Sequence, residues 1–308
     1  MKFLIARPVG FTPEMYEAIR ALGLEPVFLP AGADGRPGPE EAAYDGVDFS
    51  DIDAVFCYRF FCHNDIARFP RLKYIHTTSH GLDHMPLDYI RAHGIRLCDA
   101  RGVYGVPMAE YALGGVLQLY KAFPLLAAQQ RDRVWRHPET VRELTGRQVT
   151  LLGTGSVGTE CAKRFSAFGC EVIGLNRTVK PKEYFDEVHP LTELDDLLPT
   201  ADVVVITVAL TEETRGLMTA ARIRLMKADA ILVNISRGAV IPAQALEESI
   251  DQIGGAVLDV FEEEPLSPNS LLWDKQNVLI SPHNSFVGEG NAERLSHLVI
   301  RHIKNLSV

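Results

Sequence analysis

The chain has 308 residues, of which 46% are hydrophobic and 23% are charged, a balance typical of a soluble globular protein and too apolar for a disordered one. A chain of this length predicts two domains, each large enough to bury its own core. The 31 basic and 40 acidic residues give a net charge of −9, which offers no basic field for nucleic-acid or anionic-membrane phosphates.

The N-terminal segment MKFLIARPVG has a four-residue apolar run, shorter than the hydrophobic region of a signal peptide. No apolar run approaches the length of a membrane span. The cysteines form an odd set without a CxxC pair, which favours buried thiols in a reducing compartment over a disulfide or zinc framework. We therefore expect a cytoplasmic protein without a membrane partner. The five cysteines are Cys57, Cys62, Cys98, Cys161 and Cys170.

Residues 2–98 alternate short apolar runs with helical segments. The first helix is predicted over TPEMYEAIRALG, with Thr12 as its N-cap, Pro13 at the first helical position and Gly23 closing it. Strands separated by helices predict a parallel sheet covered on both faces. The predicted strands are KFLIA, EPVFL, DAVFCY, KYIHT and IRLC.

The character changes near Arg101, where a long apolar helix is predicted over residues 106–126. Six β-rich runs follow, as a doubly wound dinucleotide fold requires. Residues 288–305 then have a helical pattern that predicts a tail crossing back to the first domain. The six runs are QVTLL, EVIGL, ADVVVITV, AILVNIS, GGAVLDV and NVLI.

The segment QVTLLGTGSVG, residues 148–158, predicts a strand, a tight turn and a helix. Gly153 permits the turn, Gly155 lets the backbone approach a pyrophosphate, and Gly158 allows close packing of helix on strand. The phosphates would bind the free N–H groups at the start of the helix. An ordinary glycine turn is the alternative, but the flanking strand and helix favour dinucleotide binding.

Three polar residues follow strands of the same predicted fold, at the edge where open α/β sheets bind ligands. They are Arg237 in NISRG, Glu264 in LDVFEEEPL and His283 in SPHNSF. Taken singly, Arg237 is interpreted as a surface charge, Glu264 as one of three solvated glutamates and His283 as a loop histidine. Their placement after successive strands favours a shared functional site.

With these motifs, the chain resembles the D-isomer-specific 2-hydroxyacid dehydrogenase family over essentially its whole length. The resemblance implies an α/β protein with two Rossmann-like or flavodoxin-like domains built on doubly wound parallel sheets. It implies a substrate domain of residues 1–100 plus 286–308, a dinucleotide-binding Rossmann domain of residues 101–285, and an active site in the interdomain cleft. A homodimer built through the dinucleotide domains is the assembly it implies.

The family roles carry over to individual residues of this chain. Arg237 would bind the substrate's carboxylate and carbonyl oxygen, a task that suits a planar guanidinium. His283 would be the acid and base, donating a proton to the ketone oxygen as hydride arrives from the nicotinamide. Glu264 would orient that imidazole and favour its protonated form.

The remaining contacts implied by the resemblance belong to the substrate carboxylate and to the dinucleotide. Ser79, His80 and Gly81 match the loop whose backbone N–H groups bind the substrate carboxylate, and Asp259 resembles the residue that positions the nicotinamide amide. The predicted cofactor-binding residues are Gly153, Thr154, Gly155, Ser156, Val157, Gly158, Asn176, Arg177, Thr178, Ala209, Ile235 and Asp259.

The residue after the second strand predicts which cofactor is preferred. An NAD pattern expects an acid there to hold the ribose 2′-OH, whereas this chain has Asn176 followed by Arg177 and Thr178, with Lys180 and Lys182 nearby. A neutral amide beside an arginine accepts a 2′-phosphate that a carboxylate would repel. NADPH is therefore the predicted cofactor, with NAD possible; a merely solvated basic loop is the alternative.

Two positions depart from the family pattern. Ala209 stands where the family often has proline, and residues 284–286, Asn-Ser-Phe, replace glycines that often follow the catalytic histidine. Phe286 could therefore narrow the site or pack elsewhere. Tyr104 is a candidate substrate contact or a hinge residue, and Trp135 lies in a region that reaches the partner subunit in some relatives, with a core or surface role as the alternative.

The spacing of His76, His80 and His84 suggests a metal site. However, Gly81 interrupts any helix there, the family needs no metal, and no carboxylate or cysteine set completes a site. We predict that no metal binds, while His80 can still line the substrate pocket.

The sequence thus predicts an NAD(P)H-dependent reductase that converts a small 2-keto acid, of the glyoxylate or hydroxypyruvate type, to the D-2-hydroxy acid. The alternative is a non-catalytic dinucleotide-sensing binding protein of the same fold. Relatives of that kind typically carry partner-binding extensions that are missing here.

Overall fold

The computed structural model describes residues 1–7, 11–31 and 37–305. The chain divides into two compact units: unit 1 comprises Met1–Tyr104 and Gly288–Val308, and unit 2 comprises Gly105–Val287. The boundaries expected from the sequence, after residues 100 and 285, precede those of the structure by four and two residues.

Unit 1 contains a five-stranded sheet in the order β2-β1-β3-β4-β5, and every neighbouring pair is parallel. This is the flavodoxin-like strand order, and all five predicted strands are present. Successive side chains point to opposite faces, so Phe3 and Ile5 enter one hydrophobic cluster and Leu4 another. The strands are β1 (Lys2–Ile5), β2 (Glu25–Phe28), β3 (Ile52–Cys57), β4 (Tyr74–Thr77) and β5 (Arg96–Cys98).

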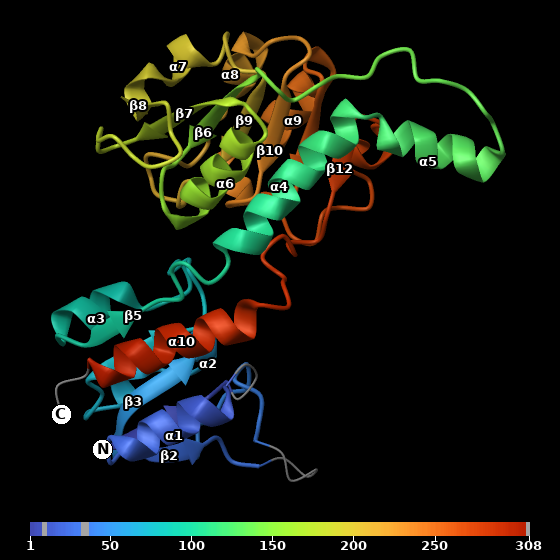
Figure 1. Ribbon diagram of the computed structural model, residues 1–308. Helices are drawn as coiled ribbons and strands as arrows, with labels where there is room; N and C mark the ends of the chain where they lie inside the picture. The colour runs from blue at the N-terminus through green and yellow to red at the C-terminus, as the bar shows by residue number, and fades with distance from the viewer. Residues whose placement is uncertain (8–10, 32–36, 306–308) are drawn as a thin grey trace. The chain divides into compact units, whose positions relative to one another are not determined.

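The first and last helices of unit 1 pack side by side against this sheet (Figure 1). The first helix begins as predicted, with Thr12 at the N-cap, Pro13 next and Gly23 at φ +70° beyond its end. The Thr12 hydroxyl lies 2.9 Å from that of Ser296, so the tail helix joins unit 1 as expected. The helices are α1 (Pro13–Ala21), α2 (Phe60–His63), the 3₁₀ turn η1 (Ile66–Arg68), α3 (Leu87–Ala92) and α10 (Asn291–Lys304).

Unit 2 contains a seven-stranded parallel sheet in the order β12-β11-β10-β9-β6-β7-β8, which extends the Rossmann strand order by one strand. The count of six expected from the sequence is wrong, because β8 was missed. That strand, EVHP, is polar, ends in proline and pairs only with β7, as suits a sheet edge. The strands are β6 (Gln148–Leu152), β7 (Glu171–Asn176), β8 (Glu187–Pro190), β9 (Val203–Ile206), β10 (Ile231–Asn234), β11 (Gly255–Leu258) and β12 (Val278–Ile280).

The predicted single helix over residues 106–126 is wrong, because the structure has two helices there, α4 and α5. The chain turns at Ala122, whose φ is +52°, and Pro124 has no N–H to donate to the carbonyl of Tyr120. The second of these helices buries none of its side chains and projects from the rest of unit 2 (Figure 1). The helices are α4 (Gly105–Tyr120), α5 (Phe123–Asp132), α6 (Ser156–Ala167), α7 (Leu194–Leu197), α8 (Ala220–Leu225) and α9 (Ala243–Ser249).

Hydrophobic clusters cover both faces of the unit 2 sheet. Leu151 and Val205 belong to one cluster, while their neighbours Leu152 and Ile206 belong to the other. Sheet faces buried in this way leave the strand ends and the loops beyond them as places for ligands. The loops also contain short 3₁₀ turns: η2 (Leu191–Glu193), η3 (Gly238–Val240), η4 (Ile250–Gln252) and η5 (Leu271–Asp274). Within the described residues, no helix has both the length and the apolar character needed to cross a membrane.

Candidate functional site

The glycine turn joins β6 to α6 as the sequence predicts, and its glycines differ in surroundings. Gly153 has φ +107°, a conformation that L side chains rarely adopt. A Cβ on Gly158 would lie 2.0 Å from the carbonyl oxygen of Gly153, so the helix packs there only without a side chain. A Cβ on Gly155 would meet nothing within 4 Å. The structure therefore has open space at the position where the motif requires a phosphate to approach.

The first turn of α6 offers donors to that space. Ser156 Oγ is buried and has no hydrogen-bond partner in the described part of the chain, and the dipole of this 12-residue helix favours an anion at its start. The Val157 side chain is buried in the core, so its backbone N–H is what can face a ligand. Thr154 is also buried, and its hydroxyl accepts a hydrogen bond from Asn176 Nδ2 at 2.8 Å. These residues fit a bound pyrophosphate.

The basic loop after β7 is tied to the same turn. Lys182 Nζ donates to the Thr154 carbonyl, and the Asn176 side-chain oxygen accepts from the backbone N–H of Arg177 at 2.9 Å. The Arg177 guanidinium is exposed and lies 3.7 Å from Glu213, a separation and exposure that make this ion pair weak. Thr178 is exposed beside it. An amide and a loosely held arginine therefore occupy the place of the acid in the NAD pattern.

Two further predicted cofactor contacts follow neighbouring strands. Ala209, after β9, is exposed, and its carbonyl accepts a hydrogen bond from the Thr214 hydroxyl at 2.7 Å. Ile235, after β10, is buried in the core. The side chain at Ile235 thus supports the sheet, and its backbone is what remains for a ligand.

Glu264 and His283 are in direct contact. Glu264 Oε2 lies 2.8 Å from His283 Nδ1, and its other oxygen accepts from the backbone N–H of Phe261 at 3.0 Å. Both side chains are a little over one third exposed, so the pair is accessible to a reactant. The ring of Phe286 stands edge-on to the imidazole, with centroids 6.1 Å apart. The contact fixes the ring orientation through Nδ1.

The turn that carries His283 is bound to Asp259. The Asp259 carboxylate is buried and accepts from Ser281 Oγ at 2.5 Å and from the backbone N–H groups of Asn284 and Ser285 at 2.8 and 3.0 Å. Its backbone carbonyl accepts from the His283 N–H at 2.8 Å. Three donors on one carboxylate thus set the path of residues 281–285.

Tyr111, on α4, extends this network. Its hydroxyl donates to Ser281 Oγ at 2.5 Å, and burial raises the pKa of Tyr111, so the hydroxyl remains a donor at neutral pH. Sequence reasoning missed Tyr111 because 170 positions separate it from Ser281. Ser281 itself lies in the SPH motif. A polar residue two positions before the histidine could therefore have indicated a hydrogen-bonding role at this position.

Arg237 follows β10 at the start of η3, and its Nη1 donates to the Ser236 carbonyl at 2.9 Å. Asn234, which sequence reasoning also missed, organises this loop: its side chain accepts from Ser236 and donates to the Arg237 carbonyl at 3.2 Å. Its backbone carbonyl accepts from the Asp259 N–H at 3.0 Å. The loops carrying Arg237 and Asp259 are therefore adjacent within unit 2.

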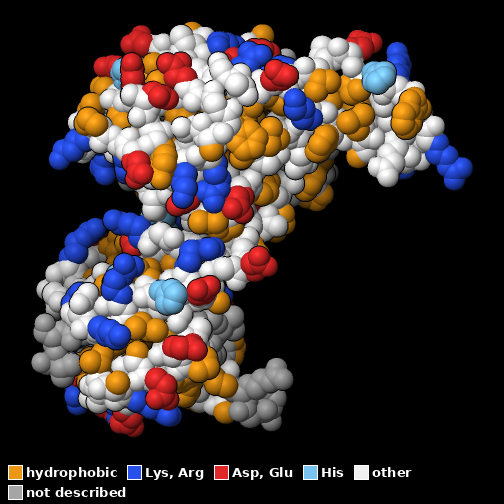
Figure 2. Space-filling model, in the orientation of Figure 1, with side chains coloured by type: hydrophobic (Ala, Val, Ile, Leu, Met, Phe, Trp, Pro, Cys, Tyr) orange, Lys and Arg blue, Asp and Glu red, His pale blue; other side chains and the backbone are white. Residues whose placement is uncertain are grey.

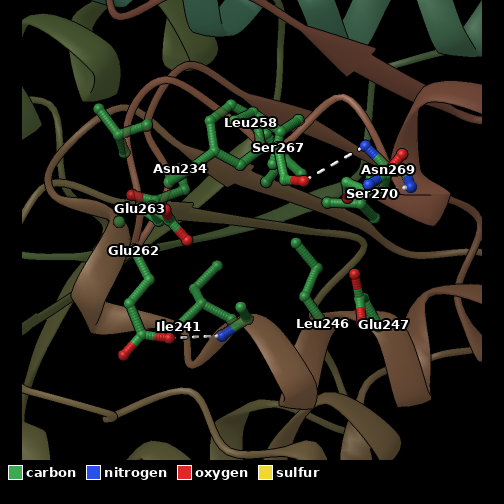
Figure 3. A pocket seen from close by; sticks show the side chains of 16 residues that line it. Asn234, Ile241, Leu246, Glu247, Leu258, Glu262, Glu263, Ser267, Asn269 and Ser270 are labelled. Carbon is green, nitrogen blue, oxygen red and sulfur yellow. Dashed lines mark hydrogen bonds between the residues drawn. The ribbon is translucent and has the colours of Figure 1, made fainter.

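Two cavities flank the loop that follows β11. One, of about 510 Å³, is walled by Trp273, Pro265 and Ile280 and opens beside Glu264 and His283. The other, of about 250 Å³, holds Asn234 and Leu258 on one wall and Ile241 and Leu246 on another, with Glu262 reaching the backbone N–H of Ala243 (Figure 3). Phe261 and Leu266 line both cavities.

The predicted carboxylate loop lies in unit 1, directly after β4. The Ser79 hydroxyl lies 2.9 Å from that of Thr77, donates to the Gly81 carbonyl at 2.8 Å and lies 3.3 Å from His84 Nε2. His80 is half-buried within the loop. Ser79 therefore braces the turn, and its backbone N–H also donates to Thr77 Oγ1 at 3.4 Å. Tyr104, whose pKa is raised by burial, donates to the Thr78 carbonyl.

His76 does not form a metal site with His80 and His84, the two other histidines of the spacing by four. It is fully buried in β4, its Nε2 lies 3.2 Å from His302 Nδ1, and burial lowers the pKa of His76 to about 3. It is therefore a neutral core residue. Among the described residues, no group of three or more His, Cys, Asp or Glu side chains lies close enough to hold a metal ion.

Known proteins are similar to this chain over most of its length. The model of the family described as D-isomer specific 2-hydroxyacid dehydrogenase, NAD binding domain, matches residues 113–285. A glyoxylate reductase of Thermofilum pendens is 34% identical over 248 residues, which are 76% of this chain and 71% of that protein. A glyoxylate/hydroxypyruvate reductase A of Arabidopsis thaliana is 32% identical over 232 residues, 74% and 72% of the two chains.

Among solved structures, a D-isomer specific 2-hydroxyacid dehydrogenase from Xanthobacter autotrophicus, in complex with NADPH and MES, superposes with a TM-score of 0.76. It is 28% identical, and the match covers 98% of this chain and 94% of that one.

The glycine turn generates a paired prediction. Gly155→Ala adds a methyl group that meets no protein atom, so its unfolding free energy should change by less than about 0.5 kcal/mol. The same methyl occupies the space for the pyrophosphate, so Kd for NADPH and NADH should rise at least about tenfold, roughly 1.4 kcal/mol. Gly158→Ala, as the contrasting variant, should lose about 1–3 kcal/mol of stability through overpacking. Urea unfolding measures the free energy of unfolding of each variant, and calorimetric titration measures its Kd for the cofactors. Unchanged affinity in Gly155→Ala would contradict the assignment of this turn to the pyrophosphate.

Proposed function

Because the chain belongs to the D-isomer specific 2-hydroxyacid dehydrogenase family and is an oxidoreductase with an NAD-binding Rossmann domain, we propose that it reduces a small 2-keto acid to the D-2-hydroxy acid. The observation that carries this proposal is the 2.8 Å contact between Glu264 and His283, at the strand ends of the dinucleotide fold. Glyoxylate or hydroxypyruvate is the proposed substrate type, the substrates named for the reductases of Thermofilum pendens and Arabidopsis thaliana.

Bound NAD(P)H supplies the hydride in this reaction, and the chain's own residues supply the charge and the proton. Arg237 binds the substrate carboxylate and carbonyl oxygen through its guanidinium. His283 donates the proton from Nε2 to the ketone oxygen. Glu264 holds Nδ1, which keeps the ring oriented for the transfer.

Asp259 retains a place in cofactor binding under this proposal. A carboxylate offers about four lone-pair positions, and three are taken by Ser281, Asn284 and Ser285. The remaining position is assigned to the nicotinamide carboxamide. Asp259 would then connect cofactor binding with the turn that carries His283.

Replacing the proposed acid tests the mechanism. His283→Ala should lower kcat by a factor of about 10²–10⁴, because proton transfer to the ketone oxygen loses its donor. His189→Ala is the matched control, since His189 also pairs with a carboxylate in unit 2, Glu193 at 2.8 Å, and should retain full activity. The assay follows NADPH and NADH oxidation with glyoxylate, hydroxypyruvate and pyruvate. Retained turnover in His283→Ala would remove His283 from the mechanism.

The alternative is a protein of the same fold that binds the dinucleotide without turning over a substrate. The assay above separates the two. Cofactor binding with no turnover on any 2-keto acid would favour the sensing protein, whereas turnover that His283→Ala abolishes favours the reductase.

NADPH is the proposed cofactor, with NAD as the possible second. Asn176 offers an amide rather than a carboxylate at the ribose, and exposed Arg177, held only by a 3.7 Å contact to Glu213, can turn to a 2′-phosphate.

The kcat/KM for NADPH should therefore exceed that for NADH. Asn176→Asp keeps the shape and the hydrogen bond to Arg177 but adds a negative charge, so kcat/KM for NADPH should fall at least about tenfold while that for NADH is retained or rises. Lys275→Ser serves as the control, because Lys275 is a basic residue of unit 2 that pairs with Asp251, and it should leave the ratio nearly unchanged. A clear NADH preference in the unmodified protein would contradict the proposal.

The proposed assembly is a homodimer that forms through unit 2. Exposed apolar side chains gather on α5 and the segment after it (Figure 2), with Trp135 99% exposed and Phe123 and Val134 about half exposed. Such a patch marks an interaction surface.

The five cysteines are free thiols, which agrees with the cytoplasm as the proposed location.

Removing apolar area from this segment should dissociate the dimer. The double variant Phe123→Ser, Trp135→Ser should sediment mainly as a monomer at concentrations where the unmodified protein sediments as a dimer. Phe168→Ser removes an exposed aromatic ring elsewhere on unit 2 and should remain dimeric. A monomeric unmodified protein would overturn the proposed assembly.

A further inference from the structure

Unit 1 carries a cluster of basic and aromatic side chains around Tyr58, at the carboxyl ends of β1 and β3. The Arg7 guanidinium carbon lies 5.3 Å from the centroid of the Tyr58 ring, and that of Arg59 lies 5.9 Å from it. The imidazole of His84 packs edge-on against the same ring, with centroids 5.2 Å apart. Tyr58 thus holds two guanidinium groups and one imidazole together.

A buried carboxylate fixes this cluster. Glu40 is 3% exposed, and one of its oxygens accepts from Arg7 Nη1 at 2.7 Å. Its other oxygen accepts from the backbone N–H groups of Tyr58 and Arg59, at 2.7 and 3.3 Å. Burying an ionised carboxylate is tolerated because these donors compensate for lost hydration. The carboxylate therefore holds Arg7 and the start of the loop in place.

The charges of the cluster do not balance among the described residues. Its two guanidinium groups stand there against one ion-paired carboxylate, that of Glu40 on Arg7, so one positive charge is left over. Among the described residues, Arg59 takes part in none of the salt bridges of unit 1, and it is exposed. The excess charge therefore lies on Arg59, on a guanidinium that is accessible to an anion.

The cluster is continuous with the predicted carboxylate loop. His84 Nε2 lies 3.3 Å from the Ser79 hydroxyl, and His84 also packs on Tyr58. Tyr104 donates to the carbonyl of Thr78 and lies near enough to Arg7 and Tyr58 for their charges to affect its pKa, which burial raises. An anion-binding loop and an unbalanced arginine therefore share one edge of the unit 1 sheet.

We propose that Arg59, backed by Arg7, binds a second acidic group at the far end of the substrate, so that the protein prefers 2-keto diacids over 2-keto acids with an apolar side chain. This inference rests on the proposed reductase function and specifies its substrate class. The loop at residues 79–81, on the same edge of unit 1, takes the carboxylate beside the ketone. Arg59 takes the other acid through a charge-assisted, bidentate contact that a neutral side chain cannot form.

Substrate pairs of equal chain length test the proposal. Oxaloacetate is compared with 2-ketobutyrate, and 2-ketoglutarate with 2-ketopentanoate. The diacid of at least one pair should have a kcat/KM at least tenfold higher than its partner. Arg59→Gln should remove this advantage, mainly by raising KM for the diacid, while kcat/KM for the monoacids changes less than twofold. Arg59→Lys should retain part of it.

Arg91→Gln serves as the matched control, because Arg91 is an exposed arginine of unit 1 that forms a salt bridge with Asp88. It should leave all four substrates unchanged. Equal kcat/KM within both pairs, or an equal loss for diacids and monoacids in Arg59→Gln, would overturn the proposal.

A binding measurement separates this inference from the reductase assignment. Calorimetric titration with 2-ketoglutarate, in the presence of saturating NADP⁺, should show at least tenfold weaker binding to Arg59→Gln than to the unmodified protein. Absent turnover on every 2-keto acid, together with this loss, would reject the reductase function and retain the diacid site. Equal binding to both proteins would reject the diacid site whatever the turnover.

Discussion

The Asp259 carboxylate is the constraint on which the geometry of the candidate site depends. It is 1% exposed, and an ionised group so placed is stable only when its oxygens are hydrogen-bonded. Two of its three donors are backbone N–H groups of residues 284 and 285, so satisfying the charge also bends the chain after β12. His283 lies inside that bend with φ +51°, a conformation that costs a non-glycine residue about 1–3 kcal/mol and persists because the surrounding bonds determine it.

The two sheets explain why such groups lie where they do. Both are parallel and both have hydrophobic clusters on their two faces, so the side chains within the strands are mainly apolar. The polar residues of interest accordingly follow the strands: Ser79 follows β4, Arg237 follows β10 and Asp259 follows β11. The alternation of side chains along each strand thus builds the core on both faces of the sheet, and the carboxyl ends of the strands are left for ligand binding.

The sequence was sufficient to predict the two-sheet fold and the Gly153–Gly158 turn, because apolar runs and glycine spacing are local signals. It failed at β8, whose polar edge sequence lacks an apolar run, and at residues 121–124, where helix-forming apolar residues obscured Pro124. The roles of Arg237, Glu264 and His283 remain predictions, although the structure shows the last two in contact. The link from Tyr111 to Ser281 was beyond sequence reasoning, because only folding brings α4 to the end of β12.

Three carboxylates near strand ends differ in how many hydrogen bonds they accept, and the difference separates two structural groups from the one proposed to take part in the reaction. Glu40 and Asp259 are almost fully buried and each binds three donors, at least two of them backbone N–H groups, so moving either would disrupt the fold of a loop. Glu264 differs, since it is 36% exposed and binds one backbone donor, with its other oxygen on an imidazole that can gain or lose a proton. A carboxylate that must stabilise a changing charge needs this freedom. By the same criterion, Arg59 differs from Arg7: Glu40 holds the Arg7 guanidinium, whereas the Arg59 guanidinium has no salt-bridge partner within the described part of the chain and is the one proposed to bind a ligand.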